Sequence, residues 1–103
     1  MAQNQQIVTV SQVNSYIKFM FEQDDNLRRL YVSGEISNFK KHYPSGHLYF
    51  SLKDGKSVIR AVMFASQAKN LGFEPKDGMN VILIGRISCY EVAGQYQIYV
   101  DRI

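Results

Sequence analysis

Three residue types are scarce in this sequence: 103 residues include one cysteine, two prolines and no tryptophan. A single cysteine excludes an intrachain disulfide and any zinc site that needs two thiolates. No apolar run approaches the ~20 residues that a membrane-spanning helix needs. The N-terminus also lacks the cationic start and apolar stretch of a signal peptide. These absences favour a cytoplasmic protein without a membrane partner.

Residues that could support catalysis or hold a cofactor are also few. The sequence has no glycine-rich phosphate loop. His42 and His47 are the only histidines and have no evident third metal ligand. The segment 74–76, Glu-Pro-Lys, matches only the E-x-K half of a nuclease signature, with no acid convincingly placed before it. We therefore expect no catalytic residue, no metal site and no cofactor in this segment.

The composition predicts one folded domain, since 46% of the residues are hydrophobic and 20% are charged. A polar arm over residues 1–7 precedes a helix that begins near Thr9. Thr9-x-x-Gln12 has the spacing of a capping box. The apolar positions that follow lie on one helical face; they are Val13, Ile17, Met20 and Phe21. The polar cluster 22–26 is expected to end the helix.

The rest of the chain shows strand-like alternation broken by turn residues. The expected strands are 31–37, 47–53, 57–64, 80–90 and 96–103, with a loop at 38–46 and a short helix at 65–71. Gly34 indicates a bulge or a tight bend. This order favours a mainly β, five-stranded antiparallel OB-fold Greek-key barrel with an N-terminal helix and a short helix between strands 3 and 4. Residues 1–26 would form the arm and amphipathic helix, and 27–103 the barrel. The periodicity alone also allows an SH3-like barrel or an open α+β sheet.

The net charge of +3 is unevenly distributed along the chain. Residues 38–69 hold six basic groups against one acidic group, or +5, whereas the remaining residues hold six against eight, or −2. The same window contains five aromatic residues. Basic groups interleaved with aromatic rings are typical of surfaces that bind single-stranded nucleic acid. The alternative is a solvated charged loop beside ordinary core aromatics.

An OB barrel binds ligands across strands 2 and 3, and the basic window coincides with that zone. Tyr49 and Phe64 are the expected stacking residues, and His47 is expected at the mouth of the barrel. The expected phosphate contacts are Lys40, Lys41, Lys53 and Arg60. These residues together predict a nucleic-acid-binding face.

Several segments, in order, resemble one known family. They are TVSQVN (9–14), GEISNF (34–39), SGHLYFSLKD (45–54), VMF (62–64) and YEVAGQYQ (90–97). The chain is similar to the N-terminal domain of the exodeoxyribonuclease VII large subunit, from about residue 8 to residue 103.

The resemblance implies an OB fold that binds single-stranded DNA for a separate, C-terminal nuclease part of the same polypeptide, and a small helical subunit as partner. It adds Asn38 and Phe39 to the expected DNA-side residues. Family members often carry an arginine where this chain has Ala65 and another where it has Ala93, so weaker binding is expected here.

Three functions remain open on the sequence alone. The chain could be a DNA-binding module of a nuclease, a protein-interaction module with an incidental basic face, or a free-standing protein that binds single strands or tRNA. Because the sequence stops inside an expected strand, we expect the polypeptide to continue beyond Ile103. Self-association through the N-terminal helix is also possible.

Overall fold

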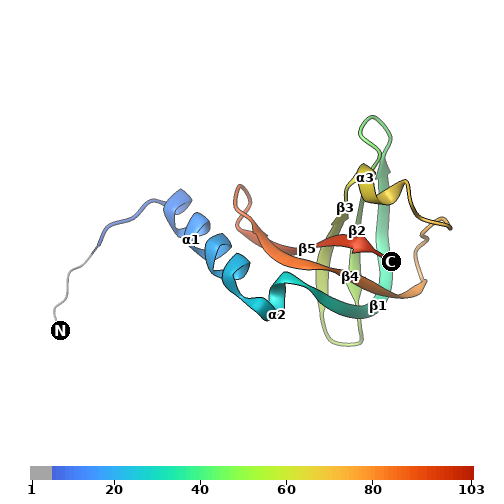
Figure 1. The fold of residues 1–103 in the computed structure, drawn as a ribbon, viewed down its shortest axis with the longest axis horizontal. Coiled ribbons are helices and arrows are strands. Elements are labelled where there is room, and N and C mark those ends of the chain that lie inside the picture. Colours follow the sequence, from blue (N-terminus) through green and yellow to red (C-terminus); the bar gives the residue numbers. More distant parts are fainter. Residues whose placement is uncertain (1–5) are drawn as a thin grey trace.

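The computed structural model describes residues 6–103, so residues 1–5 of the expected polar arm lie outside it. A long helix, a short helix and five strands follow one another, with a third helix after the third strand (Figure 1). The elements are α1 (Val10–Gln23), α2 (Asp25–Arg28), β1 (Leu30–His42), β2 (His47–Lys53), β3 (Val58–Met63), α3 (Ala65–Ala68), β4 (Asn80–Tyr90) and β5 (Gln95–Arg102). No helix in this part of the chain is long and apolar enough to cross a membrane.

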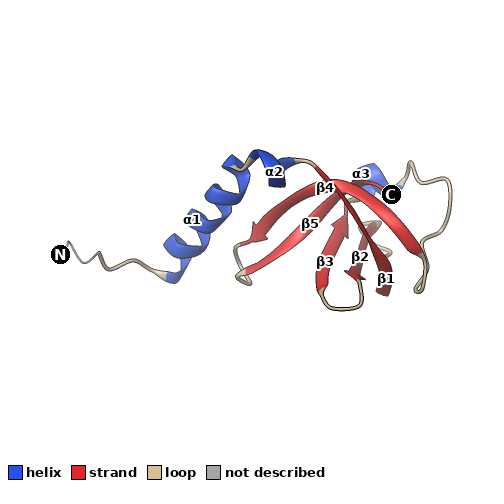
Figure 2. Ribbon diagram, turned by 90° about the horizontal axis from the view of Figure 1, so that it is seen from below, coloured by secondary structure: helices blue, strands red, loops and turns tan. Residues whose placement is uncertain are grey.

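The five strands form a closed barrel in the order β1-β2-β3-β5-β4 (Figure 2). Every neighbouring pair is antiparallel except β3 and β5, which run parallel and close the barrel. The predicted five-stranded barrel is therefore confirmed. The closing pair places Arg60 opposite Gln97 and Val62 opposite Tyr99.

Strand β1 is longer than expected and serves two neighbours. Its first half pairs with β4 up to Glu35, and from Glu35 onward it pairs with β2. Gly34 lies at this change of partner, where a Cβ would come within 2.7 Å of Leu52 Cγ, so the close approach requires glycine. The bulge lies further along, between Ser37 and Lys40.

The prediction that residues 38–46 form a loop was wrong for residues 38–42. The bulge absorbs Asn38 in the left-handed region, at φ 52°, and the strand then continues to His42. Asn tolerates this conformation better than most residues because its short side chain can hydrogen-bond locally. Only residues 43–46 form the turn between β1 and β2.

The inward faces of the strands form one hydrophobic core. The predicted alternation on the second strand holds, because Leu48, Phe50 and Leu52 are buried. On β4, Leu83 and Cys89 are buried as well. On β2 the core takes alternate residues, and Tyr49 between them lies on the outer face of the sheet. On β3, Ala61, Val62 and Met63 are buried in succession.

Helix α1 begins as predicted, with Thr9 and Gln12 forming a capping box. It ends at Gln23, inside the polar cluster. Asp24 then caps the short helix α2, which the sequence did not reveal, by accepting hydrogen bonds from the N–H groups of Asn26 and Leu27. Helix α3 ends at Ala68, three residues before the expected Leu71.

Candidate nucleic-acid interface

One row of side chains crosses the outer surface of the whole barrel. Lys40 lies opposite Tyr49, Tyr49 opposite Val62, Val62 opposite Tyr99, and Tyr99 opposite Arg86. Residues directly opposite one another on paired strands point to the same side of the sheet. The register therefore aligns two aromatic rings between a lysine and an arginine.

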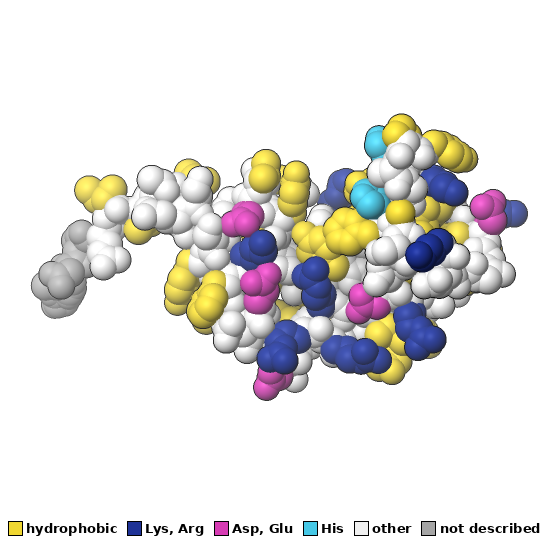
Figure 3. Space-filling model, turned by 45° about the horizontal axis from the view of Figure 1, so that its top comes forward, with side chains coloured by type: hydrophobic (Ala, Val, Ile, Leu, Met, Phe, Trp, Pro, Cys, Tyr) yellow, Lys and Arg dark blue, Asp and Glu magenta, His cyan; other side chains and the backbone are white. Residues whose placement is uncertain are grey.

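A hollow of about 470 Å³ lies along this row. Its walls come from β2, β3, β5 and the turn between β4 and β5. The lining residues are Tyr49, Arg60, Val62, Phe64, Tyr90, Ala93, Gln95, Gln97 and Tyr99. We call this hollow the outer-face hollow. On one face of the molecule, hydrophobic side chains gather beside the two histidines, with Lys and Arg side chains around them (Figure 3).

Four rings form a chain of contacts at one end of the outer-face hollow. The ring of Phe64 lies 5.1 Å from the His47 ring and 6.0 Å from the Tyr99 ring, centroid to centroid. The His47 and Tyr49 rings are 6.4 Å apart. Tyr49 and Phe64 are each 41% exposed, so both present ring surface to solvent while their neighbours hold them in place. Such rings can stack on unpaired bases.

Arg86 adds a cation to this aromatic surface. Its guanidinium carbon lies 4.5 Å from the centroid of the Tyr99 ring, which is a cation–π contact. Arg60, from β3, lines the same hollow and is exposed. The two guanidinium groups can neutralise phosphates on a strand whose bases lie against the rings.

His47 fixes the start of helix α3 relative to strand β2. Its Nδ1 accepts a hydrogen bond from the Ala65 N–H at 2.9 Å. A nitrogen that accepts cannot carry the proton, so the neutral ring carries it on Nε2. The neighbouring turn is held by His42, whose ring lies 2.7 Å from the Ser45 hydroxyl. Because the Phe64 ring contacts the His47 ring, this hydrogen bond helps to position Phe64 in the wall of the hollow before any ligand arrives.

The turn between β4 and β5, which forms another wall, is anchored to helix α1. Glu91 in this turn accepts hydrogen bonds from the Ser15 hydroxyl at 2.8 Å and the Lys18 ammonium at 3.2 Å. Asn14 donates to the Glu91 backbone carbonyl at 2.9 Å. The Ser15 hydrogen bond, followed by Lys18, lowers the pKa of Glu91, and the Glu91 hydrogen bond raises the pKa of Lys18. Two residues of this short segment, Tyr90 and Ala93, line the hollow.

The structure brings together five of the residues predicted from the sequence. His47, Tyr49, Arg60 and Phe64 meet at the outer-face hollow, and Lys40 lies on the same row as Tyr49. Lys53 is on the same side of the sheet but at the far end of β2, between Glu35 and Val58.

Three other predicted residues lie elsewhere. Phe39 and Lys41 line a separate hollow at the end of the barrel. Asn38 forms the bulge, and the next N–H, that of Phe39, donates to the Asp77 carboxylate at 2.8 Å. Side chains after Asn38 alternate between the two sides of β1, so Lys40 joins the outer row whereas Phe39 and Lys41 line the other hollow.

Sequence reasoning missed Tyr99, Arg86, Gln95 and Gln97. All four lie outside the basic window, and they join the site through strands β4 and β5. Two signals were available: Gln97 and Tyr99 fall on one face of the expected strand 96–103, and Gln95 and Gln97 lie in the segment 90–97 that carries the family resemblance. Among residues 6–103, no group of three or more His, Cys, Asp or Glu side chains is placed to hold a metal ion.

A closed five-stranded barrel with aromatic and basic side chains across its outer face defines an OB-fold nucleic-acid-binding domain. The chain belongs to that family: residues 8–103 match the family described as OB-fold nucleic acid binding domain. Within it, the chain is similar to proteins named exodeoxyribonuclease 7 large subunit. It is 52% identical to the one from Staphylococcus epidermidis strain ATCC 12228, 50% to that from Staphylococcus carnosus and 51% to that from Staphylococcus aureus strain Newman. Each match covers 93% of this chain and 21% of the relative, so the chain spans about a fifth of their length. The predicted family is confirmed.

Proposed function

We propose that this chain is the single-stranded DNA-binding module of an exodeoxyribonuclease VII large subunit. One observation carries the proposal: the rings of Tyr49, Phe64 and Tyr99 share one hollow, with Arg60 in its wall and Arg86 stacked on Tyr99. Aromatic faces stack on bases only where the bases are unpaired, and arginines bind the phosphates between them. This combination favours a single strand over a duplex.

The strand would be held here for a nuclease part of the same polypeptide outside residues 1–103. Two facts support this division of work. The relatives are named as exodeoxyribonucleases and are about five times longer than this chain, which covers 21% of them. The outer-face hollow itself contains rings, amides and one arginine, with no carboxylate among its lining residues. We infer that the whole enzyme degrades DNA in the cytoplasm, and that its small subunit binds to the part outside this chain.

Self-association is a separate proposal, and helix α1 supplies the surface for it. Among the exposed apolar side chains of α1, four are 39% to 78% exposed and follow one line along the helix; they are Val10, Val13, Ile17 and Met20. Their spacing of three and four residues places them along one stripe, which a second copy of the helix would match. Sedimentation equilibrium of the chain, with Ile17→Glu as the variant expected to be monomeric, tests this.

The DNA proposal is tested by fluorescence anisotropy of labelled oligo-dT, compared with the same label in a duplex, from 50 to 200 mM salt. We expect preference for the single strand, with an affinity on the order of micromolar or weaker. Three cations lie on the row or in the hollow: Lys40, Arg60 and Arg86. If all three meet phosphates, the slope of log affinity against log salt should be about −2.

Variants then locate the binding surface. Tyr49→Ala and Phe64→Ala should each weaken binding by about 1–3 kcal/mol, because each removes a stacking ring. Arg60→Ala should reduce the salt slope by about 0.7. Lys56→Ala, an exposed cation in the turn between β2 and β3, is the matched control and should have little effect. No binding at 50 mM salt, or three variants that behave like the control, would refute the proposed surface.

A further inference from the structure

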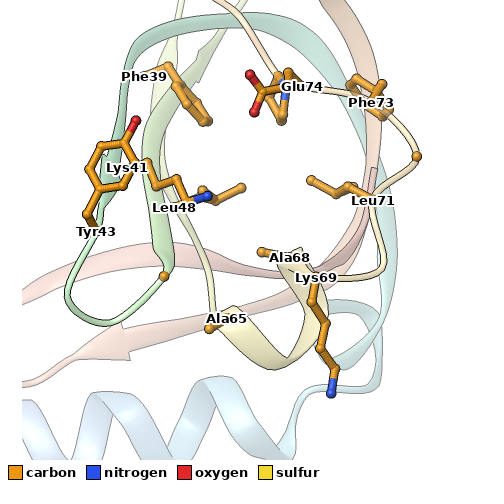
Figure 4. Close-up of a pocket in the computed structure, with 13 residues that line it drawn as sticks. Phe39, Lys41, Tyr43, Leu48, Ala65, Ala68, Lys69, Leu71, Phe73 and Glu74 are labelled. Atoms are coloured by element: carbon orange, nitrogen blue, oxygen red, sulfur yellow. The ribbon is translucent and has the colours of Figure 1, made fainter.

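A second hollow, of about 570 Å³, lies at the end of the barrel (Figure 4). It is enclosed by the end of β1, the turn 43–46, helix α3 and the segment 69–75. Its apolar floor consists of Phe39, Leu48, Ala68 and Leu71, and Leu48 and Leu71 point toward each other across it (Figure 4). We call this hollow the barrel-end groove. The function proposed above makes no use of it.

The rims of the barrel-end groove carry exposed aromatic rings and lysines. Tyr43, on the turn between β1 and β2, is 81% exposed, and Phe73, on the opposite side of the groove, is 42% exposed (Figure 4). The Lys41 ammonium lies 5.4 Å from the centroid of the Tyr43 ring. Lys69 extends outward from the groove (Figure 4). Rings and lysines around an apolar floor match the requirements of an unpaired nucleotide.

Three hydrogen bonds tie β1 to residues 77–79, which follow the groove-lining segment; one is the Ile36 N–H donating to the Met79 carbonyl at 2.9 Å. The Phe39 N–H donates to the Asp77 carboxylate at 2.8 Å, and the Gly78 N–H donates to the Ile36 carbonyl at 2.8 Å. The segment before β4 is thereby tied to β1 at Ile36, before the bulge, and at Phe39, within it. A ligand would meet a hollow that is already shaped.

The barrel-end groove and the outer-face hollow are adjacent along two segments of the chain. On β1, Lys40 belongs to the outer row with Tyr49, whereas Lys41 lines the groove. At the end of β3, Phe64 lines the outer-face hollow and Ala65 lines the groove. At both places a single backbone segment, which we call the ridge, separates the two sites. A strand that leaves the first site over this ridge arrives at the second.

We propose that the barrel-end groove is a second nucleotide subsite, which binds a base of the same DNA strand that occupies the outer-face hollow. This inference rests on the proposed function. The base enters the groove and its sugar and phosphates stay at the rim with Lys41 and Lys69, because the apolar floor and the Glu74 carboxylate disfavour a phosphate inside. Tyr43 and Phe73 provide the stacking surfaces on the two sides.

Oligonucleotides of different length distinguish binding at one subsite from binding at both. We would measure the binding of labelled oligo-dT of three and of eight nucleotides to wild type, Tyr43→Ala and Phe73→Ala. Each variant should bind the octanucleotide about 5-fold or more weakly, which corresponds to the lower end of the stacking contribution of about 1 kcal/mol. We expect a trinucleotide to be too short to occupy both sites and to bind at the outer-face hollow, so its affinity for the variants should equal its affinity for wild type. Lys41→Ala should lower the salt slope by about 0.7 for the octanucleotide only.

Matched controls lie outside both sites. Tyr31→Ala removes a ring on β1 that is 66% exposed, and Lys76→Ala removes an exposed cation from the segment that precedes β4. Both should bind the two oligonucleotides like wild type. Phe73→Leu, which keeps an apolar side chain but removes the ring, replaces Phe73→Ala if thermal unfolding shows that the alanine variant is not folded.

The possible outcomes are distinct. If the octanucleotide binds Tyr43→Ala and Phe73→Ala as tightly as it binds Tyr31→Ala, the strand does not enter the groove and the inference is wrong. Equal losses for both lengths would also overturn it, because the groove would then not be a separate subsite. If neither oligonucleotide binds wild type, the proposed function itself fails.

Discussion

Tyr99 connects the stacking surface to a cation. Its ring lies 6.0 Å from that of Phe64 on one side, and Arg86 lies over it at 4.5 Å. A ring held between another ring and a guanidinium group has little freedom to rotate, so it is already oriented for a base. The affinity of the face should therefore depend on this ring as much as on the two rings of β2 and β3.

Replacing Tyr99 separates the role of its ring from that of its hydroxyl. Tyr99→Ala should weaken the binding of oligo-dT by about 1–3 kcal/mol. Tyr99→Phe keeps the aromatic face and should bind almost like wild type. Anisotropy titrations of both variants provide the comparison. Equal losses in the two variants would show that the hydroxyl, rather than the ring face, carries the contact.

Gly85 is required by the way β4 passes over β5. The register between these strands shifts between Ile84 and Gly85, and a Cβ on Gly85 would overlap the backbone carbonyl oxygen of Tyr99. Because the obstacle is backbone, a side-chain rotation cannot relieve it. Gly85→Ala should lower the free energy of unfolding by about 1–3 kcal/mol, measured by urea denaturation.

Gly55 provides the control for this prediction. No atom lies within 4 Å of the position that its Cβ would occupy, and its φ is not positive. Gly55→Ala should leave the stability unchanged or raise it by up to about 1 kcal/mol, since alanine reduces the entropy of the unfolded chain. A Gly85→Ala variant as stable as Gly55→Ala would mean that the strands cross differently.

At the scale of elements, helix α1 holds the turn between β4 and β5 through polar contacts. Ser15, Lys18 and Asn14 converge on Glu91. The face of α1 that touches the barrel is the one that carries Asn14, Lys18 and Phe21, whose ring lies 6.3 Å from that of Tyr96. Of the predicted apolar positions, only Phe21 packs on the core, and Val13, Ile17 and Met20 stay exposed. The helix contributes to the site indirectly, because Tyr90 and Ala93 on either side of Glu91 line the outer-face hollow.

The Glu91 contacts predict how stability depends on pH. The Ser15 hydrogen bond and the Lys18 charge lower the pKa of Glu91 in the folded state below its ordinary value of 4.5. A depressed pKa means that the stabilisation is fully present above the unfolded pKa and is lost as the pH falls through the folded pKa. Wild type should therefore be more stable than Glu91→Gln near neutral pH, and the difference should shrink below about pH 4.5.

Thermal unfolding of both proteins between pH 3 and pH 7 measures this difference. Lys18→Met is a second comparison, since it removes the cation and keeps the length of the side chain. It should lose part of the same pH-dependent stabilisation, while the Ser15 hydrogen bond remains. A difference between wild type and Glu91→Gln that is constant over the whole range would contradict the prediction.

The elements differ in how well the sequence predicts them. Strand alternation and the capping box are local signals, and they located all five strands and the start of α1. The bulge at Asn38 is also local but ambiguous, because a polar residue before Phe39 fits a loop as well as a bulge. The expected helix 65–71 is three residues longer than α3, which ends at Ala68.

The candidate site was only partly predictable for a physical reason. Tyr49 lies on β2 and Phe64 directly follows β3, and a hairpin joins these two strands, so alternation along the chain predicts that both residues lie on one face. Tyr99 and Arg86 join them only because β5 pairs with β3 across the closing seam. A single sequence contains no local signal for that parallel pairing, since the paired segments are far apart in the chain.

At the scale of the whole molecule, we expect DNA binding and DNA cleavage to reside in different parts of the polypeptide. Residues 1–103 should bind oligo-dT but not shorten it in the presence of Mg²⁺ or Mn²⁺, because the proposed nuclease part lies in the remainder of the polypeptide, outside this chain, which covers 21% of the relative it matches. Gel electrophoresis of a labelled single strand after long incubation checks this. Metal-dependent shortening by the purified chain would assign the nuclease activity to this segment.

The contact between α1 and the β4–β5 turn also sets the order in which the molecule can fold. Asn14 and Glu91 are 77 residues apart in sequence, and the closing strands β3 and β5 are also distant. At synthesis rates of about 5–20 residues per second, α1 waits roughly 4–15 s on the ribosome before its partner exists. Contacts of such long range make folding slow, and they form late. The core strands and the α1 face that carries Asn14 and Lys18 thus stay open to chaperones until the last strand is made, and the outer-face hollow, which needs Tyr99 of β5, is completed only then.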